Sequence, residues 1–126
     1  MTTKEIVNQI TDTYTINNRA TDNVCGMEEC RYLTKDGRMC AVGMCMNELS
    51  LKEFGTVMGD VHDLNEIVEQ KVSDQGLDYL LKEEYKGHPL KFWKKLQQLH
   101  DNKKYWDDDG LNERGKRLAN LIIDEY

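Results

Sequence analysis

The chain has 126 residues, of which 39% are hydrophobic and 32% are charged. This composition is typical of a globular protein and too rich in apolar and aromatic side chains for a disordered one. The length predicts a single domain over residues 1–126, with enough residues to bury one hydrophobic core. The 23 acidic residues outnumber the 17 basic ones and give a formal net charge of −6. Because proteins that bind a nucleic-acid backbone cluster Lys and Arg, this balance argues against a nucleic-acid partner.

No apolar run approaches the length that crosses a bilayer, and the residues after Met1 lack the apolar stretch of a secretory signal. We therefore expect a cytoplasmic protein with no membrane contact. The four cysteines should be reduced in that compartment. The sequence leaves the oligomeric state open.

The first predicted helix begins at Thr2 or Thr3, since Thr2 and Glu5 have the spacing of a capping box. It should end near residues 17–18, where the sequence becomes polar and rich in turn-forming residues. Several apolar residues recur at helical spacing and should face the core: Ile6, Val7, Ile10 and Tyr14.

A β-hairpin over about residues 29–43 is the most distinctive predicted element. The dipeptide Asp36-Gly37 separates two β-prone runs, and Gly reaches the positive φ that a tight turn needs. A type I turn with Gly37 in the left-handed conformation pairs Tyr32 with Cys40, whereas a two-residue turn shifts this register.

Helical periodicity returns after Gly43. Pro89 suits the first turn of a helix that runs to about His100. The acidic run 107–109 favours the positive N-terminal end of a last helix. Capping spacings predict further helical segments that begin at Ser50, Asp63 and Asp74. We therefore predict an α+β fold, a mostly helical single domain with an N-terminal helix, one hairpin and several helices packed on it.

The cysteines have the spacing C-x4-C-x9-C-x4-C around the predicted turn. A folded hairpin would bring both pairs together, and four thiolates can form a tetrahedral structural zinc site. The short C-x2-C pairs of many zinc modules are missing, however, and free cysteine often serves as a small buried hydrophobe. We expect no cofactor and keep a zinc-stabilised structural module as an alternative, with these ligands: Cys25, Cys30, Cys40 and Cys45.

A cysteine-dependent enzyme is a second alternative. Cys40 would be the nucleophile, and His100 with Asp101 would supply a general base and the carboxylate that orients it. The dipeptides His62-Asp63 and His100-Asp101 also match a motif of metal-dependent phosphohydrolases, although matches of two residues are weak. Sequence spacing alone does not bring Cys40 and His100 together, so we favour a binding protein over an enzyme.

The segment Lys91–Lys95 mixes cations with aromatic residues, as in proteins that bind single-stranded nucleic acid. Helical spacing favours another interpretation, in which Phe92 faces the core, the lysines are solvated and Trp93 lies at the border. We predict that the binding surface lies on the hairpin and near it, with these residues: Tyr32, Arg38 and Trp93.

Two motifs of the sequence resemble those of a group of small phage, prophage and bacterial proteins. The motifs are Cys30-x-Tyr32 with Asp36-Gly37-Arg38-x-Cys40-Ala41-Val42-Gly43, and Leu96-Gln97-x-x-His100-Asp101. In that group the first motif is a hairpin that precedes the second, a helix, and the group has no assigned activity. Here Met44-Cys45-Met46 replaces the usual Cys-Leu-Ile, and the segment 47–87 is longer.

This resemblance implies a phage-related origin. Small phage proteins without an enzyme signature often bind a host factor or sequester a defence signal. The resemblance therefore implies a cytoplasmic interaction protein, a host-takeover or counter-defence factor. Its partner would be a host protein or a small signalling molecule in the host cytoplasm.

Overall fold

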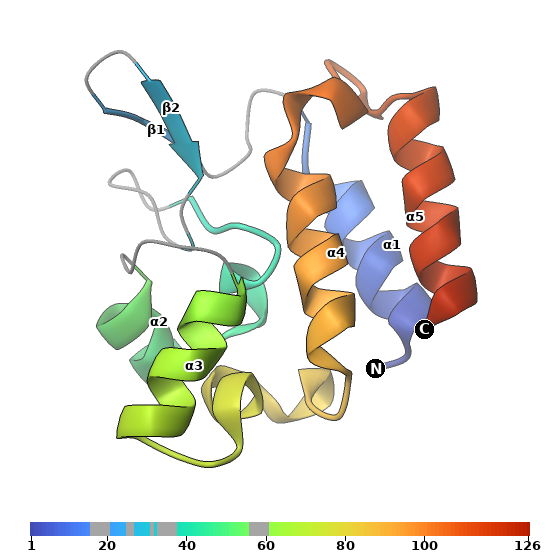
Figure 1. Ribbon diagram of the computed structural model, residues 1–126. Coiled ribbons are helices and arrows are strands. Elements are labelled where there is room, and N and C mark those ends of the chain that lie inside the picture. Colours follow the sequence, from blue (N-terminus) through green and yellow to red (C-terminus); the bar gives the residue numbers. More distant parts are fainter. Residues whose placement is uncertain (16–20, 25–26, 31, 33–37, 56–60) are drawn as a thin grey trace.

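The computed structural model describes residues 1–15, 21–24, 27–30, 32, 38–55 and 61–126 (Figure 1). The expected α+β class is confirmed, because helices dominate and the strands form short antiparallel ribbons. The helices and strands are α1 (Thr3–Thr13), β1 (Thr21–Val24), β2 (Met27–Cys30), α2 (Glu48–Phe54), α3 (Val61–Lys71), α4 (Leu90–Asp101), β3 (Trp106–Asp107), β4 (Gly110–Leu111) and α5 (Glu113–Glu125). Short 3₁₀ turns lie between them: η1 (Gly43–Cys45), η2 (Gly76–Leu80), η3 (Glu83–Tyr85) and η4 (Lys103–Tyr105).

Three helices form the main layer of the fold. Helix α5 packs against both α1 and α4, and Figure 1 shows α1 behind the other two helices. Helix α3 packs against α4 on the side away from α5 and also contacts η2. Burial of apolar side chains between these elements supplies the main stabilising free energy. None of the described helices is both long enough and apolar enough to cross a membrane.

The N-terminal helix begins as predicted. The Thr2 hydroxyl accepts a hydrogen bond from Glu5 N at 3.1 Å, and the Glu5 carboxylate accepts one from Thr2 N at 2.9 Å. This reciprocal pair satisfies two of the amide groups that a helix N-terminus leaves without partners. The predicted apolar face is buried. The helix ends at Thr13, somewhat before the expected residues 17–18.

A two-stranded ribbon that the sequence did not predict lies before the predicted hairpin. Strands β1 and β2 pair in antiparallel register from Thr21 with Cys30 to Val24 with Met27. The predicted turn at residues 36–37 lies outside the described residues. One contact of the predicted hairpin is seen, since Cys40 N donates a hydrogen bond to Tyr32 O at 3.1 Å.

The segment after Cys40 turns instead of continuing as a strand, and it meets a distant part of the chain. Met46 forms an isolated antiparallel bridge with Leu81. Asn47 N donates to Leu80 O at 2.8 Å, and Lys82 N donates to Cys45 O at 2.9 Å. These bonds require extended backbone near Leu81, so the helix predicted after Asp74 is replaced by the turns η2 and η3.

Helices α2 and α3 begin earlier than their predicted caps. Asn47 caps α2, because its side chain accepts a hydrogen bond from Ser50 N at 2.9 Å. Ser50 is therefore inside the helix and buried. Helix α3 begins at Val61, which places Asp63 in its first turn.

The acidic run 107–109 does not cap the last helix. It forms the turn of a tight hairpin between β3 and β4, in which Asp107 Oδ1 accepts a hydrogen bond from Asp109 N at 3.0 Å. Gly110 follows with a φ of 125°, a conformation that glycine adopts without steric cost. Asn112 is the true cap of α5, since its side chain accepts from Gly115 N at 3.0 Å.

Candidate functional site

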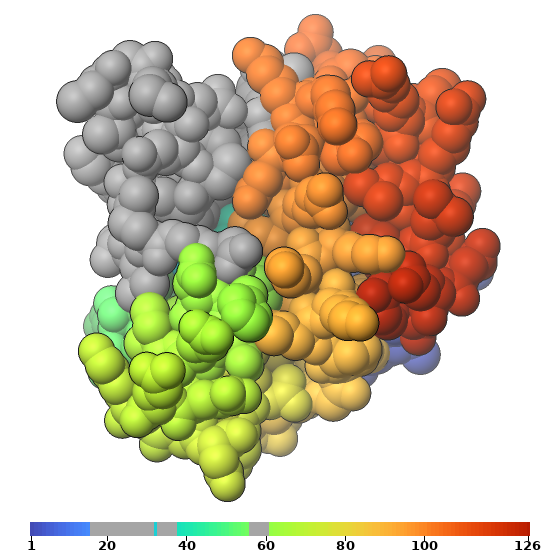
Figure 2. Space-filling model, in the orientation of Figure 1, coloured from blue at the N-terminus to red at the C-terminus, as the bar shows by residue number. Residues whose placement is uncertain are grey.

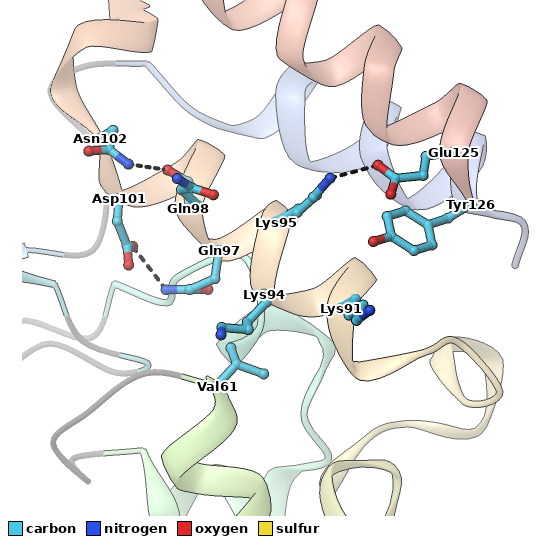
Figure 3. A pocket seen from close by; sticks show the side chains of 10 residues that line it. All are labelled: Val61, Lys91, Lys94, Lys95, Gln97, Gln98, Asp101, Asn102, Glu125 and Tyr126. Carbon is cyan, nitrogen blue, oxygen red and sulfur yellow. Dashed lines mark hydrogen bonds and ion pairs between the residues drawn. The ribbon is translucent and has the colours of Figure 1, made fainter.

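A candidate site among the described residues is a groove along α4, with a volume of about 700 Å³. Figure 2 shows the face of the molecule on which α3, α4 and α5 adjoin, and Figure 3 shows the side chains of the groove. Pockets for small molecules usually have volumes of roughly 300–1,000 Å³. The groove is lined by Val61 of α3, by Lys91, Lys94, Lys95, Gln97, Gln98, Asp101 and Asn102 of α4 and its C-terminal end, and by Glu125 and Tyr126 at the C-terminus.

The first half of α4 gives the groove a positive end. Lys91 and Lys94 are exposed, and neither has an ion pair or side-chain hydrogen bond within the described residues. Lys95 differs, because its Nζ donates to Glu125 Oε2 at 2.6 Å and lies 5.8 Å from the centre of the Tyr126 ring. The hydrogen bond raises the pKa of Lys95 and lowers the pKa of Glu125. Two cationic groups therefore remain available to a ligand.

The second half of α4 gives the groove a polar end. The Gln98 side chain is exposed and makes no hydrogen bond in the described part of the chain. Asn102 Nδ2 donates to Gln98 O at 2.8 Å, which holds the Asn102 side chain beside the helix end. Asp101 Oδ1 accepts from Gln97 Nε2 at 2.9 Å (Figure 3). Donors and acceptors thus lie one to two turns beyond the lysines.

Gln97 connects this groove to the buried interior. Its side chain is only 7% exposed. While its amide nitrogen donates to Asp101, its Oε1 accepts a hydrogen bond from Val42 N at 3.3 Å. Gly43 N in turn donates to Cys40 Sγ at 3.2 Å. The two sequence motifs therefore meet in space, with Gln97 holding the turn after Cys40 against α4.

The geometry does not make Cys40 a nucleophile. Cys40 and His100 are both fully buried. Burial, together with the charge of Asp101, raises the pKa of Cys40 to about 12. Asp101 Oδ1 lies 2.7 Å from His100 Nδ1, and the Tyr14 ring packs edge-on against His100 with centroids 4.9 Å apart. A catalytic thiol needs access and a lowered pKa, so this arrangement suits a structural thiol.

The residues that the sequence placed on the binding surface are mostly interior. Tyr32 is 3% exposed and Trp93 is 1% exposed, so neither presents its ring to a partner. Arg38 is half-buried. Trp93 faces inward because its helix is covered on two sides, and its ring packs 5.0 Å from Phe92. The prediction that Trp93 lies at the border of the helix is therefore wrong.

The four-cysteine zinc site stays a prediction. Cys25 lies outside the described residues, as does the side chain of Cys30. Cys40 and Cys45 are buried free thiols, and Cys45 Sγ donates to Ala41 O at 3.4 Å. Burial also raises the pKa of Cys45. Among the described residues, no group of three or more His, Cys, Asp or Glu side chains is placed to hold a metal ion.

The groove itself was missed at the sequence level. The helical spacing predicts that the lysines of α4 face solvent, and Lys91 and Lys94 are indeed exposed. The spacing does not indicate which residues lie beside them. Val61 and Tyr126 come from distant parts of the chain, and no spacing rule connects them to α4. Comparison of the chain with protein-family models, curated proteins and solved structures gives no match.

Proposed function

We propose that this chain is a phage-type interaction protein of the host cytoplasm that binds a small phosphorylated molecule in the α4 groove. Binding would sequester that molecule, in keeping with a counter-defence role. The observation that carries the proposal is the pair Lys91 and Lys94, two exposed ammonium groups without ion pairs among the described residues, at one end of a groove of about 700 Å³.

Helical spacing directs the lysines and the polar groups to the same side. Lys91, Lys94 and Lys95 are followed by Gln98 and Asn102 at intervals of three and four residues, which places them along one face of α4. From Lys91 to Asn102 the helix advances about 16 Å at about 1.5 Å per residue. A ligand that bridges both ends must therefore carry its anionic group some distance from its other polar groups.

The two ends of the groove favour different parts of such a ligand. The ammonium groups of Lys91 and Lys94 match phosphate oxygens, which Lys binds as a point charge. The carboxamide of Gln98 can both donate and accept, as the edge of a nucleobase requires. Val61 adds an apolar side chain to the lining of the groove. A nucleotide has this combination of phosphate, apolar ring and hydrogen-bonding edge.

The buried position of Cys40 supports binding over the alternative of a cysteine-dependent enzyme. At neutral pH a thiol whose pKa is about 12 is almost entirely protonated, and the protonated form is a poor nucleophile. Lys91 and Lys94 of the groove are exposed, whereas the Cys40 thiol is fully buried. A ligand held by these lysines would therefore not need the thiol.

Isothermal titration calorimetry with AMP, adenosine and inorganic phosphate tests the proposal. The test variant is Lys91→Gln with Lys94→Gln, which removes both charges and keeps the length of the side chains similar. The matched control is Lys4→Gln with Lys52→Gln, two exposed lysines of α1 and α2 outside the groove.

We expect AMP to bind more tightly than adenosine or phosphate alone, because it reaches both ends of the groove. The double variant should weaken AMP binding about tenfold or more, which corresponds to the loss of about 1.4 kcal/mol. The control should bind like the wild type. Equal heats for the test variant and the control, or no binding of AMP, would contradict the proposal.

A further inference from the structure

A second surface, separate from the α4 groove, lies on the exposed face of α5. Arg114, Arg117, Leu118 and Leu121 recur at intervals of three and four residues along this helix, so they share one face. Together with Lys104 and Tyr105 they line a depression of about 330 Å³. None of these residues lines the α4 groove.

The apolar part of this surface contains an exposed leucine. Leu121 is 63% exposed, while Leu118 and Tyr105 are half-buried beside it. A single exposed leucine is ordinary on a protein surface. Here it adjoins two further apolar side chains, so a partner could bury a continuous patch rather than one methyl group.

The charged side chains that line the depression are all positive. Lys104, Arg114 and Arg117 are exposed, and none of them has an ion pair within the described residues. Lys104 Nζ lies 5.2 Å from the centre of the Tyr105 ring, which holds this charge at the edge of the depression. Asp124, one turn beyond Leu121, limits the positive stretch to the first two turns of α5. Such a cluster is notable in a chain whose net charge is −6.

We infer that the α5 face docks an acidic segment of a partner protein that also carries an apolar side chain. The carboxylates would pair with Arg114 and Arg117, which bind carboxylates in a bidentate manner. The apolar side chain would cover Leu121. An amphipathic acidic helix presents carboxylates and apolar side chains at the same spacing as the residues of the α5 face.

A protein segment fits this surface better than a nucleic acid does. Phosphates could pair with the arginines, but a nucleic-acid backbone offers nothing apolar for Leu121. The combination of arginines, an aromatic residue and an exposed leucine is typical of protein interfaces.

Fluorescence anisotropy with a labelled synthetic peptide tests this inference. The peptide carries Glu and Leu at positions i, i+3, i+4 and i+7 of a helix, and a matched peptide has Lys in place of Glu. Single-stranded DNA and phosphatidylserine vesicles serve as competing probes. The test variants are Arg114→Gln with Arg117→Gln, and Leu121→Gln. The controls are Lys116→Gln on the same helix and Val72→Gln, an exposed apolar residue of another surface.

We expect the acidic peptide to bind at low salt, the Lys peptide not to bind, and added salt to weaken the complex. The double arginine variant should raise Kd about tenfold and Leu121→Gln about threefold, with both controls unchanged. All of these side chains are exposed, so each variant should melt like the wild type. Failure of the acidic peptide to bind, equal binding by the variants, or preference for DNA or vesicles would overturn the inference.

Discussion

The substitution Gln97→Leu tests whether the turn after Cys40 is held on α4 by one side chain. Leu keeps the approximate volume of the buried side chain, so the change removes hydrogen bonds with little change in packing. Val42 N, which donates to Gln97 Oε1 at 3.3 Å, then loses its oxygen acceptor in a fully buried position and keeps only the weak sulfur acceptor of Cys40. Asp101, which is partly exposed, can replace its lost donor with water.

The magnitude follows mainly from the amide of Val42. Loss of the good acceptor of a buried donor costs about 1–3 kcal/mol, and we expect a loss of about 2 kcal/mol in the free energy of unfolding. For a chain of 126 residues the unfolding entropy at about 2.1 cal/mol/K per residue converts this loss into a fall of about 7–8 °C in the melting temperature.

Thermal unfolding followed by circular dichroism measures this change. The matched control is Gln98→Leu, the adjacent residue of the same helix, whose side chain is exposed and makes no hydrogen bond among the described residues. The control should shift stability by less than about 0.5 kcal/mol. Equal melting temperatures for the two variants would refute the proposed role of Gln97.

The remaining predictions concern the same turn. Gly43→Ala should lower the melting temperature, because a Cβ at this position would clash with the backbone oxygen of Tyr32. Overpacking of this kind costs about 1–3 kcal/mol, and a wild-type melting curve would contradict the prediction. Cys40 should resist iodoacetamide near pH 8 without denaturant, as peptide mass spectrometry would reveal, whereas fast alkylation would show an accessible thiolate. Because burial raises the pKa of Cys40 from 9.0 to about 12, its contribution to stability is complete below pH 9 and is lost as pH rises towards 12. Urea unfolding across this range should therefore show a steeper loss for the wild type than for Cys40→Ala, and parallel curves would exclude this titration.

Features that depend on neighbouring residues could be predicted from the sequence. The capping box of Thr2 and Glu5 is local, and the periodic apolar face of α1 needs no other part of the chain. Pro89 likewise indicates the beginning of α4. In each case one short stretch of the sequence contains the whole interaction.

Features that depend on competing local signals were predicted less well. The run 107–109 is acidic enough to suit a helix N-terminus, but Asn112 lies nearer the helix and caps it. Four apolar residues between 77 and 85 suggested a helix, and all are buried. Their backbone is set by the bridge between Met46 and Leu81, a contact between distant segments that helical propensity cannot express.

The candidate sites depend on tertiary contacts and were the least predictable. The two sequence motifs contain Cys40 and the helix that carries His100, and these two segments do meet in the structure. Only the structure shows that the Gln97 side chain joins them, by a hydrogen bond to Val42 N. Trp93 was placed at the helix border, since nothing in the sequence shows that α3 covers that side of α4.

The most direct test of the proposed function is a titration of the isotopically labelled protein with AMP, followed by two-dimensional amide NMR. Binding in the proposed groove predicts that the amide signals that shift lie between Lys91 and Asn102 of α4 and at the C-terminal Tyr126. The amide signals of the α5 face, at Arg114 and Leu121, should not change. A spectrum that does not respond to AMP, or shifts that gather on another surface, would contradict the assignment of the α4 groove as the binding site.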